Sequence, residues 1–338
     1  MKRVLTICAL AAVCAAVVFT VLFVAHPEKS PAAAAEKKLR IVTTIFPQYD
    51  FAKQITGEDA EVVMLLKPGA ESHSYEPTPK DIKTIRDADL FIYVGGENDV
   101  WVEDILASMG EARPATLKLL DCVETLDEEL VEGMESDHEH GEHAHDEHAE
   151  AEAGHDDHDE HEHEVDEHVW TSPKNAIAIV QAITAVLEQK DPARAEQYRA
   201  NSNAYQAELA KLDASFREIT ASAANKTILF ADRFPFRYFA EEYGLTYYAA
   251  FSGCSTETEA SAATVAFLIN KVREERLPVV FTIELSNGKI ADSVSEATGA
   301  RKLQLHSCHT VTADQLRAGE TYLSLMTQNE ETLRAALR

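Results

Sequence analysis

The chain has 338 residues, of which 45% are hydrophobic and 26% are charged. This composition is typical of a globular protein with one large domain or two domains of about 150 residues each. The formal net charge of −27 argues against nucleic-acid binding, because phosphate recognition needs clustered Lys and Arg. The acidity is concentrated in residues 124–167, which hold 21 Asp or Glu, no Lys or Arg, and nine of the 14 histidines.

Residues 1–38 are predicted to form an N-terminal signal or membrane anchor followed by a tether. Lys2 and Arg3 precede an uncharged run of 21 residues, Val4 to Val24. A run of this length suits a signal-peptide core or a bilayer-spanning helix. We therefore expect an exported protein, either anchored on the extracytoplasmic face of the membrane or periplasmic.

Residues 39–123 alternate short apolar runs with helical segments, which predicts an N-terminal α/β lobe. Such alternation implies a mostly parallel sheet with helices on its faces. A loop rich in turn residues, residues 67–79, follows the second predicted strand. The predicted strands are residues 39–45, 61–66 and 88–96, and the predicted helices are residues 46–55, 79–86 and 100–109.

The acidic insert, residues 124–167, is predicted to be disordered, because it has too few apolar residues to fold alone. Imidazole and carboxylate groups are ligands for zinc, copper and nickel. We interpret the insert as a segment for loose, multivalent capture of a transition metal. The alternative is a solvated acidic loop whose histidines are accidental. Its histidines are His138, His140, His143, His145, His148, His155, His158, His161 and His163.

Residues 168–223 are predicted to complete the N-lobe and form a long linking helix, interrupted at Asp191 and Pro192. These two residues read as an N-cap followed by Pro at the first helical position. Residues 224–338 alternate again and predict a C-terminal α/β lobe, with a cleft at the carboxyl ends of the strands. Its predicted strands are residues 227–231, 245–251, 278–284 and 301–305, and its predicted helices are residues 236–244, 258–276, 289–298 and 321–337.

Several residues with metal-binding chemistry lie in loops next to predicted strands. His73 lies in the loop of residues 67–79, where three prolines restrict the backbone. His168 ends the insert, and Asp166 or Glu167 could orient its ring. Each of these residues is commonplace alone, but together they offer acidic and imidazole groups across a cleft. The second-lobe candidates that follow strands are Asp232, Glu284, His306, Cys308 and His309.

These motifs resemble those of the metal-binding subunits of bacterial zinc/manganese ABC importers, the cluster A-I solute-binding proteins. The first-ligand loop of that family resembles KPGAESHSYEPTPKDI, and its second-ligand motif resembles DEHVWTSPKNA. Further family blocks resemble YFAEEYGL, SGCSTETEAS and GETYLSLMTQNEETLRAAL. The resemblance runs from about Leu39 to the C-terminus, interrupted by the insert. It implies two α/β lobes bridged by a long helix, with a metal in the interlobe cleft.

The resemblance also implies a ligand set, with one departure. The family offers His or Glu within a pattern like His-Asp-Ala-Phe, whereas FADRFPFRYF has Ala231 at that position. Asp232 is then the nearest candidate, and Glu284 or Cys254 could replace it. Cys254 and Cys308 could instead form a disulfide outside the cell. The implied ligands are His73, His168, His306 and Asp232.

The sequence thus predicts an extracytoplasmic receptor that captures Zn²⁺ and delivers it to an ABC permease and its ATPase. We expect a monomer that is held at the membrane by its N-terminal segment and is not an enzyme. One alternative is a Mn²⁺-binding receptor of the same fold, since manganese prefers oxygen ligands. Another is a zinc-storage or adhesin surface protein. A zinc hydrolase is the weakest alternative, because no HExxH motif is present.

Overall fold

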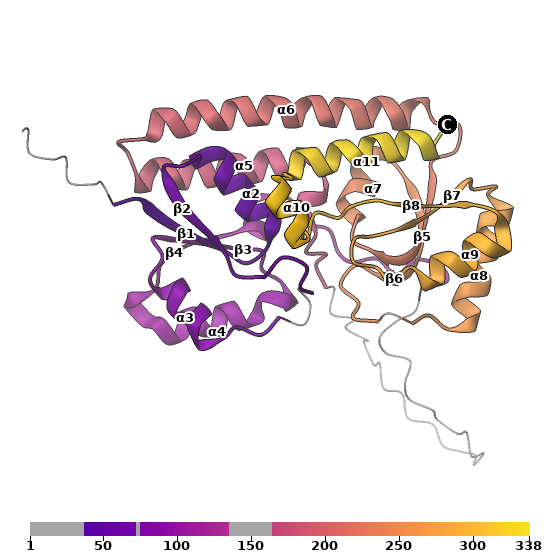
Figure 1. Cartoon of the computed structure of the whole chain (residues 1–338), viewed down its shortest axis with the longest axis horizontal. Helices are drawn as coiled ribbons and strands as arrows, with labels where there is room; N and C mark the ends of the chain where they lie inside the picture. The colour runs from indigo at the N-terminus through magenta and orange to yellow at the C-terminus, as the bar shows by residue number, and fades with distance from the viewer. Residues whose placement is uncertain (1–36, 72–74, 135–163, 258) are drawn as a thin grey trace, which may run out of the picture. The chain divides into compact units, whose positions relative to one another are not determined.

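Two four-stranded parallel sheets form the framework of this protein. The computed structural model describes residues 37–71, 75–134, 164–257 and 259–338. Strand order is β2-β1-β3-β4 in the first sheet and β6-β5-β7-β8 in the second (Figure 1), so the two sheets share one topology and the predicted α/β class is confirmed. The strands are β1 Leu39–Thr43, β2 Ala60–Met64, β3 Leu90–Tyr93, β4 Ala115–Lys118, β5 Thr227–Phe234, β6 Thr246–Ser252, β7 Val279–Thr282 and β8 Arg301–Gln304.

The inner strands β3 and β7 are almost entirely apolar, because helices cover both faces of a parallel sheet. Every residue of β3 (LFIY) and of β7 (VVFT) is buried. The edge strand β4 (ATLK) is only partly buried and has no apolar run, so the sequence did not predict it. It is defined by its pairing with β3, in which Leu90 lies opposite Ala115.

Helices begin where local capping chemistry allows them to. Thr78 and Asp81 form a reciprocal capping box at the start of α3, and the Ser172 hydroxyl accepts a hydrogen bond from the Asn175 N–H at the start of α5. The main helices are α2 Phe46–Thr56, α3 Pro79–Arg86, α4 Val100–Met109, α5 Pro173–Lys190, α6 Ala195–Ser222, α7 Arg237–Tyr243, α8 Ala262–Glu274, α9 Lys289–Thr298, α10 Ala313–Ala318 and α11 Tyr322–Ala336.

The break in the linking helix differs from the prediction. Asp191 is the C-cap of α5 and not the N-cap of the next helix, and α6 starts only at Ala195. The Asp191 carboxylate accepts hydrogen bonds from Arg194 at 2.7 Å and from the Tyr198 hydroxyl at 3.1 Å. These side-chain contacts hold the short turn between the two helices, so the predicted cap was wrong.

Two further helix boundaries also differ from the prediction. Helix α8 starts at Ala262, later than expected, because the Ser261 hydroxyl caps it by accepting the Thr264 N–H at 3.1 Å. Helix α10 was not predicted, since its six residues are too few for a clear apolar period. It is defined by a capping box between Thr312 and Gln315.

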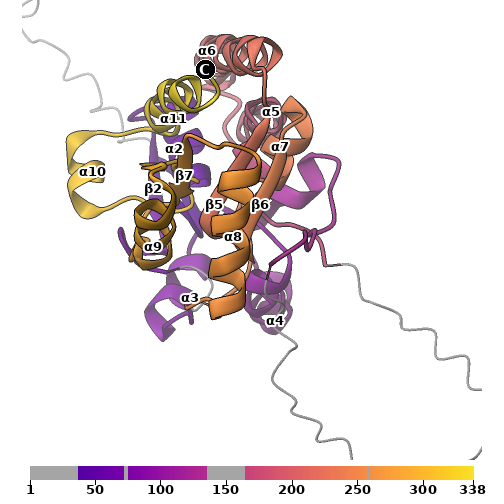
Figure 2. The same ribbon diagram turned by 90° about the vertical axis from the view of Figure 1, so that its right-hand side faces the viewer.

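The pair α5 and α6 connects the two lobes, where the sequence predicted a single interrupted helix. Helix α6 has 28 residues, about 42 Å of helix, and packs on α2, α5, α7 and α11. Figures 1 and 2 both show α11 lying alongside α6. One buried apolar cluster contains residues of both sheets and of α6, including Ile41, Phe216 and Phe230. Both lobes therefore share a continuous core.

The second sheet is covered on its other face by α8 and α9 (Figure 2). Leu268 of α8 and Val294 of α9 pack there against Leu229 and Val280 of the sheet. In the described ranges, no helix is both long and apolar enough to cross a bilayer. The predicted signal or anchor lies outside those ranges. Cys122, Cys254 and Cys308 are all free thiols, so the disulfide considered between two of them is not formed.

A buried carboxylate joins the N-lobe to the C-terminal helix. Asp50 of α2 accepts hydrogen bonds from the Tyr322 backbone N–H of α11 at 3.0 Å and from Gln54 at 3.1 Å. Burial nevertheless dominates and raises the pKa of Asp50 from 3.8 to about 6. A raised acid pKa means that the folded state binds the proton more tightly than the unfolded state. The resulting stabilisation is present at acid pH and is lost as the pH rises through 6.

We therefore predict that Asp50→Asn reduces the loss of stability on going from pH 4.5 to pH 7.5. The expected reduction is about 2 kcal/mol in the free energy of unfolding, measured by urea titration at both pH values. Asp104→Asn is the control, since this carboxylate is exposed on α4. An unchanged pH dependence in Asp50→Asn would show that the buried Asp50 carboxyl does not cause the loss of stability.

Candidate metal centre

Two hollows open at the carboxyl ends of the inner strands. These strands are β1 and β3 in the first sheet and β5 and β7 in the second. At these strand pairs the chain leaves the sheet in opposite directions, which is where open α/β sheets bind ligands. The first, the imidazole hollow, is open to solvent and lies largely at the ends of β5 and β7. The second, the aromatic hollow, is lined by Tyr75, Trp101 and Trp170. His309 lines both hollows, and His168 lines the first.

His168 is fully buried and is held by a neighbouring carboxylate. Asp166 Oδ1 accepts the His168 backbone N–H at 2.8 Å and lies 3.2 Å from ring atom Nδ1. Since a carboxylate only accepts, Nδ1 carries the proton and Nε2 carries the lone pair that a metal needs. Burial lowers the pKa of His168, but the charge and hydrogen bond of Asp166, together with the charges of Glu167 and Glu128, outweigh it and raise the pKa above its usual value.

The segment that carries Asp166 is fixed by residues on the other side of the acidic insert. Asp127 and Val165 form an antiparallel bridge, and the Asp166 N–H donates to the Leu126 carbonyl at 2.9 Å. The Tyr238 hydroxyl donates to the Asp166 carbonyl at 2.7 Å and accepts the Leu126 N–H at 3.1 Å. The two ends of the insert are therefore pinned together next to His168.

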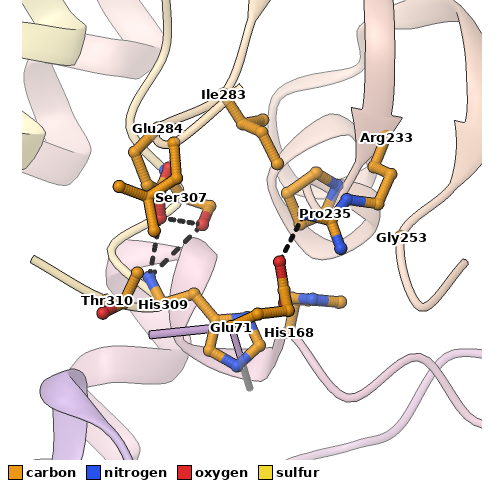
Figure 3. Close-up of a pocket in the computed structure, with 11 residues that line it drawn as sticks. Glu71, His168, Arg233, Pro235, Gly253, Ile283, Glu284, Ser307, His309 and Thr310 are labelled. Carbon is orange, nitrogen blue, oxygen red and sulfur yellow. Dashed lines mark hydrogen bonds and ion pairs between the residues drawn. The ribbon is translucent and has the colours of Figure 1, made fainter. Parts of the chain in front are cut away.

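His309 is positioned by a buried carboxylate of the second lobe. Glu284 accepts the Ser307 backbone N–H at 2.7 Å, the Ser307 hydroxyl at 2.5 Å and the His309 backbone N–H at 3.2 Å (Figure 3). Within this turn Cys308 has a φ of 61°, and Leu285, next to Glu284, has a φ of 60°. Left-handed backbone at non-glycine residues is strained and is typical of functional sites.

Three aromatic rings meet between the two hollows. The ring centroids of His168 and His309 lie 5.3 Å apart, and Trp170 lies 5.4 Å from the first and 5.0 Å from the second. The Trp170 indole N–H donates to the Ser307 carbonyl at 2.8 Å, and the Tyr322 hydroxyl donates to the Trp170 carbonyl at 2.7 Å. Trp170 thus ties the backbone near His168 to the turn that carries His309.

The structure places His306, one of the predicted ligands, away from this ring pair. Its Nδ1 accepts the Cys308 backbone N–H at 3.0 Å, so the neutral ring carries its proton on Nε2. The side chain of Asn329 accepts the His306 backbone N–H and donates to the His306 carbonyl, both at 2.7 Å. His306 is buried but does not line the imidazole hollow, whereas His309, three residues later, does.

Asp232 also has other partners, because β5 runs further than predicted. The pairing of β5 with β6 is irregular between Phe230 and Arg233, and Arg233 lines the hollow while Asp232 does not. Asp232 accepts the Arg233 N–H at 2.9 Å and the Ile283 N–H at 3.4 Å, and burial raises its pKa. His309 was among the second-lobe candidates in the sequence but not in the implied ligand set, and Arg233 was not a candidate, although it stands in the FADRFPFRYF motif.

The remaining predicted residues are placed as follows. Glu284 lines the hollow, but its carboxylate holds the turn described above. Burial raises the pKa of the Cys254 thiol well above its usual value. His73 and the nine insert histidines lie outside the described residues. The described neighbours of His73 are Glu71, which lines the imidazole hollow, and Tyr75, which lines the aromatic hollow. In the part of the chain that the structure describes, no three His, Cys, Asp or Glu side chains form a group that could hold a metal.

Comparison with known proteins identifies the class of this protein. The chain belongs to the family described as zinc-uptake complex component A, periplasmic, which matches residues 41–336. This membership confirms the resemblance found in the sequence. It also agrees with the predicted extracytoplasmic location and with zinc as the ligand.

Individual relatives match most of the chain. The high-affinity zinc uptake system protein ZnuA of Bacillus subtilis (strain 168) is 35% identical over 309 residues, which cover 91% of each chain. The zinc-binding protein AdcA of Streptococcus pyogenes serotype M3 is 32% identical over 89% of this chain, which spans 56% of the length of AdcA. The crystal structure of the Zn(II)-bound ZnuA-like domain of Streptococcus pneumoniae AdcA is 30% identical, with a TM-score of 0.70 over 89% of this chain and 99% of that one.

We predict that Trp170→Phe destabilises the fold by about 1–3 kcal/mol, because it leaves the buried Ser307 carbonyl without its indole donor. Urea unfolding of the metal-free protein measures this change. Trp101→Phe, at a half-buried tryptophan of the aromatic hollow, is the control. Equal stability changes in the two variants would show that the Trp170 hydrogen bond does not matter.

Proposed function

We propose that this protein is the extracytoplasmic receptor of an ABC importer, which captures Zn²⁺ at the imidazole hollow and delivers it to the permease. The observation that carries the proposal is the pair His168 and His309, whose rings meet at the carboxyl ends of two parallel sheets. Membership of a zinc-uptake family and the zinc-binding names of the relatives support it.

The spacing of the two rings fits a shared zinc ion. Imidazole nitrogens bind zinc at about 2.0–2.1 Å in a tetrahedral arrangement, which puts the centroids of two bound rings about 5 Å apart. The observed centroid separation of His168 and His309 is 5.3 Å. Asp166 fixes the tautomer of His168, as carboxylates do for histidines that bind metals. The geometry therefore supports joint coordination by these two residues.

We propose His73 as the third protein ligand. Its chain neighbours Glu71 and Tyr75 line the two hollows on either side of His309. Three imidazoles favour zinc over manganese, which prefers oxygen ligands. His306, Asp232, Glu284 and Cys254 are not in this proposed set, because their described contacts hold them elsewhere or give them another role.

Binding and release, not catalysis, follow from this arrangement. A zinc hydrolase needs a general base beside the metal. Glu284, a carboxylate that lines the hollow, already accepts three hydrogen bonds from the turn that carries His309. We propose a monomeric receptor, attached to the membrane by its N-terminal segment, whose partners are the permease and its ATPase. The histidine-rich insert serves as an auxiliary metal-capture segment.

We predict that one tight zinc site survives deletion of residues 137–163 and is lost in His168→Ala and in His309→Gln. Each substitution should weaken binding roughly 100-fold or more, since it removes one of few ligands. Calorimetric titration of the chain without residues 1–35 gives the affinities for Zn²⁺ and Mn²⁺.

The matched control for His309→Gln is His306→Gln, three residues away in the same segment. This variant should bind zinc within about tenfold of the parent, because His306 does not line the hollow. If all tight zinc binding disappears with residues 137–163, the proposed site is wrong. If His306→Gln abolishes binding and His309→Gln does not, the two roles are reversed.

We predict further that Asp166→Asn weakens zinc binding about 10- to 100-fold with little change in fold, as is typical for a carboxylate that orients a ligand. The asparagine keeps an oxygen for the His168 backbone N–H but no longer enforces the ring tautomer. Zinc titration at pH 7.5 with a circular-dichroism check measures this effect. Unchanged zinc affinity would show that the ring needs no such partner.

A further inference from the structure

The hydroxyl of Tyr238 joins the segment that carries Asp166 to the second lobe. Tyr238 lies on α7 and is only 3% exposed. Its hydroxyl donates to the Asp166 carbonyl at 2.7 Å and accepts the Leu126 backbone N–H at 3.1 Å. A tyrosine hydroxyl has one proton to donate, and this one is donated to the segment next to His168. The position of that segment therefore depends on a residue of the second lobe.

The part of the acidic insert that precedes its histidines lies along the second lobe. We call residues 126–134 the strap. Glu128 of the strap accepts the Cys254 backbone N–H at 3.0 Å, just after β6. Glu129 accepts the Tyr247 hydroxyl of β6, also at 3.0 Å. The beginning of the strap is therefore fixed to both ends of one strand.

The far end of the strap packs closely on α8. Lys271 of α8 pairs with Glu132 at 3.3 Å. Gly133 has a φ of 86°, and a Cβ at this position would lie 2.1 Å from a ring carbon of Phe267. Only glycine fits here without a shift of the strap or of the ring. The strap is thus held to the second lobe at both ends, although it follows β4 of the first lobe in the chain.

The two residues that precede His168 are held by different lobes. Asp166 is held by Tyr238 of the second lobe. Glu167 accepts the backbone and side-chain N–H groups of Asn98, which follows β3 of the first lobe, at 2.9 and 2.7 Å. Movement of one lobe against the other therefore acts on the segment next to the metal-binding ring. While both contacts persist, Asp166 keeps the ring of His168 in its orientation.

We propose that Tyr238 and the strap form a latch between the lobes, and that bound Zn²⁺ leaves only when the hydrogen bond between Tyr238 and Asp166 breaks. This inference rests on the proposed zinc site and names what limits the lifetime of the bound metal. Tyr238 is then a positioning residue, since it acts through Asp166 and not on the metal. The competing explanation is that Tyr238 only stabilises the packing of α7.

The experiment measures how fast Zn²⁺ leaves the full-length protein. Protein loaded with one equivalent of Zn²⁺ is mixed in a stopped-flow instrument with a chromophoric chelator, at concentrations where the rate no longer depends on the chelator. Tyr238→Phe should release zinc about tenfold faster and weaken equilibrium binding by the same factor, because the lost hydrogen bond acts on dissociation. The association rate should not change.

Tyr243→Phe is the matched control. Tyr243 lies on the same helix and is 4% exposed, but its hydroxyl donates to Asp213 of α6 at 2.9 Å. Each variant removes one tyrosine hydroxyl that donates a hydrogen bond, so urea unfolding should show a similar loss of stability in both. Only Tyr238→Phe should speed the release of zinc.

Gly133→Ala tests the strap without altering Tyr238 or any charge. The added Cβ should displace the end of the strap from Phe267 and speed release in the same direction. Since both substitutions act on one latch, their effects on the dissociation rate should be less than additive in the double variant with Tyr238→Phe. This variant keeps the inference testable even if Tyr238→Phe folds poorly.

The outcomes separate this inference from the proposed function. An unchanged release rate in Tyr238→Phe, or an equal acceleration in Tyr243→Phe, would show that Tyr238 only supports the packing of α7. That result would overturn the inference while leaving the zinc site intact. Unchanged release in Gly133→Ala, or full additivity in the double variant, would overturn the role of the strap. If the parent protein retains no zinc before the chelator is added, the proposed function is wrong instead.

Discussion

The contact between Asp166 and His168 is the interaction around which the site is built. One buried carboxylate oxygen holds both the backbone N–H and the ring of the histidine, so the ring cannot turn without breaking a hydrogen bond away from water. Gly253 closes the other side, since a Cβ there would lie 3.2 Å from the ring. The orientation of the imidazole is therefore set before any metal arrives, which is the condition for a selective site.

Carboxylates around the site act as acceptors for protein N–H groups. Asp166 holds His168, Glu284 holds the turn that carries His309, and Glu167 accepts the backbone and side-chain N–H groups of Asn98 at 2.9 and 2.7 Å. Burial raises the pKa of Glu167 to about 7. The oxygen atoms of these carboxylates therefore already accept hydrogen bonds from protein N–H groups, whereas imidazole rings line the hollow. This division favours a borderline-soft cation such as zinc over hard cations.

Most of the framework could be predicted from local patterns. Apolar runs marked the inner strands, and the ends of α3, α4 and α9 were predicted to the residue. His168 could be selected because apolar residues resume immediately after it, at Val169 and Trp170. The misses were elements without a strong local pattern, such as the edge strand β4 and the six-residue helix α10. The start of α6 was missed because side-chain contacts of Asp191 extend the turn.

The sequence by itself determined the α/β class, the order of the elements, the motif around His168 and the family resemblance, because apolar periodicity and short motifs are local. Only the tertiary structure decided which residue of the last motif meets His168. His306 and His309 are three residues apart, and the choice depends on the left-handed Cys308 and on Glu284, which lies 23 residues before Ser307. The pairing of Arg233 with Glu71 likewise joins residues 162 positions apart. Such contacts depend on how two lobes pack and have no local signature, so side-chain direction at the site is fixed only by the folded chain.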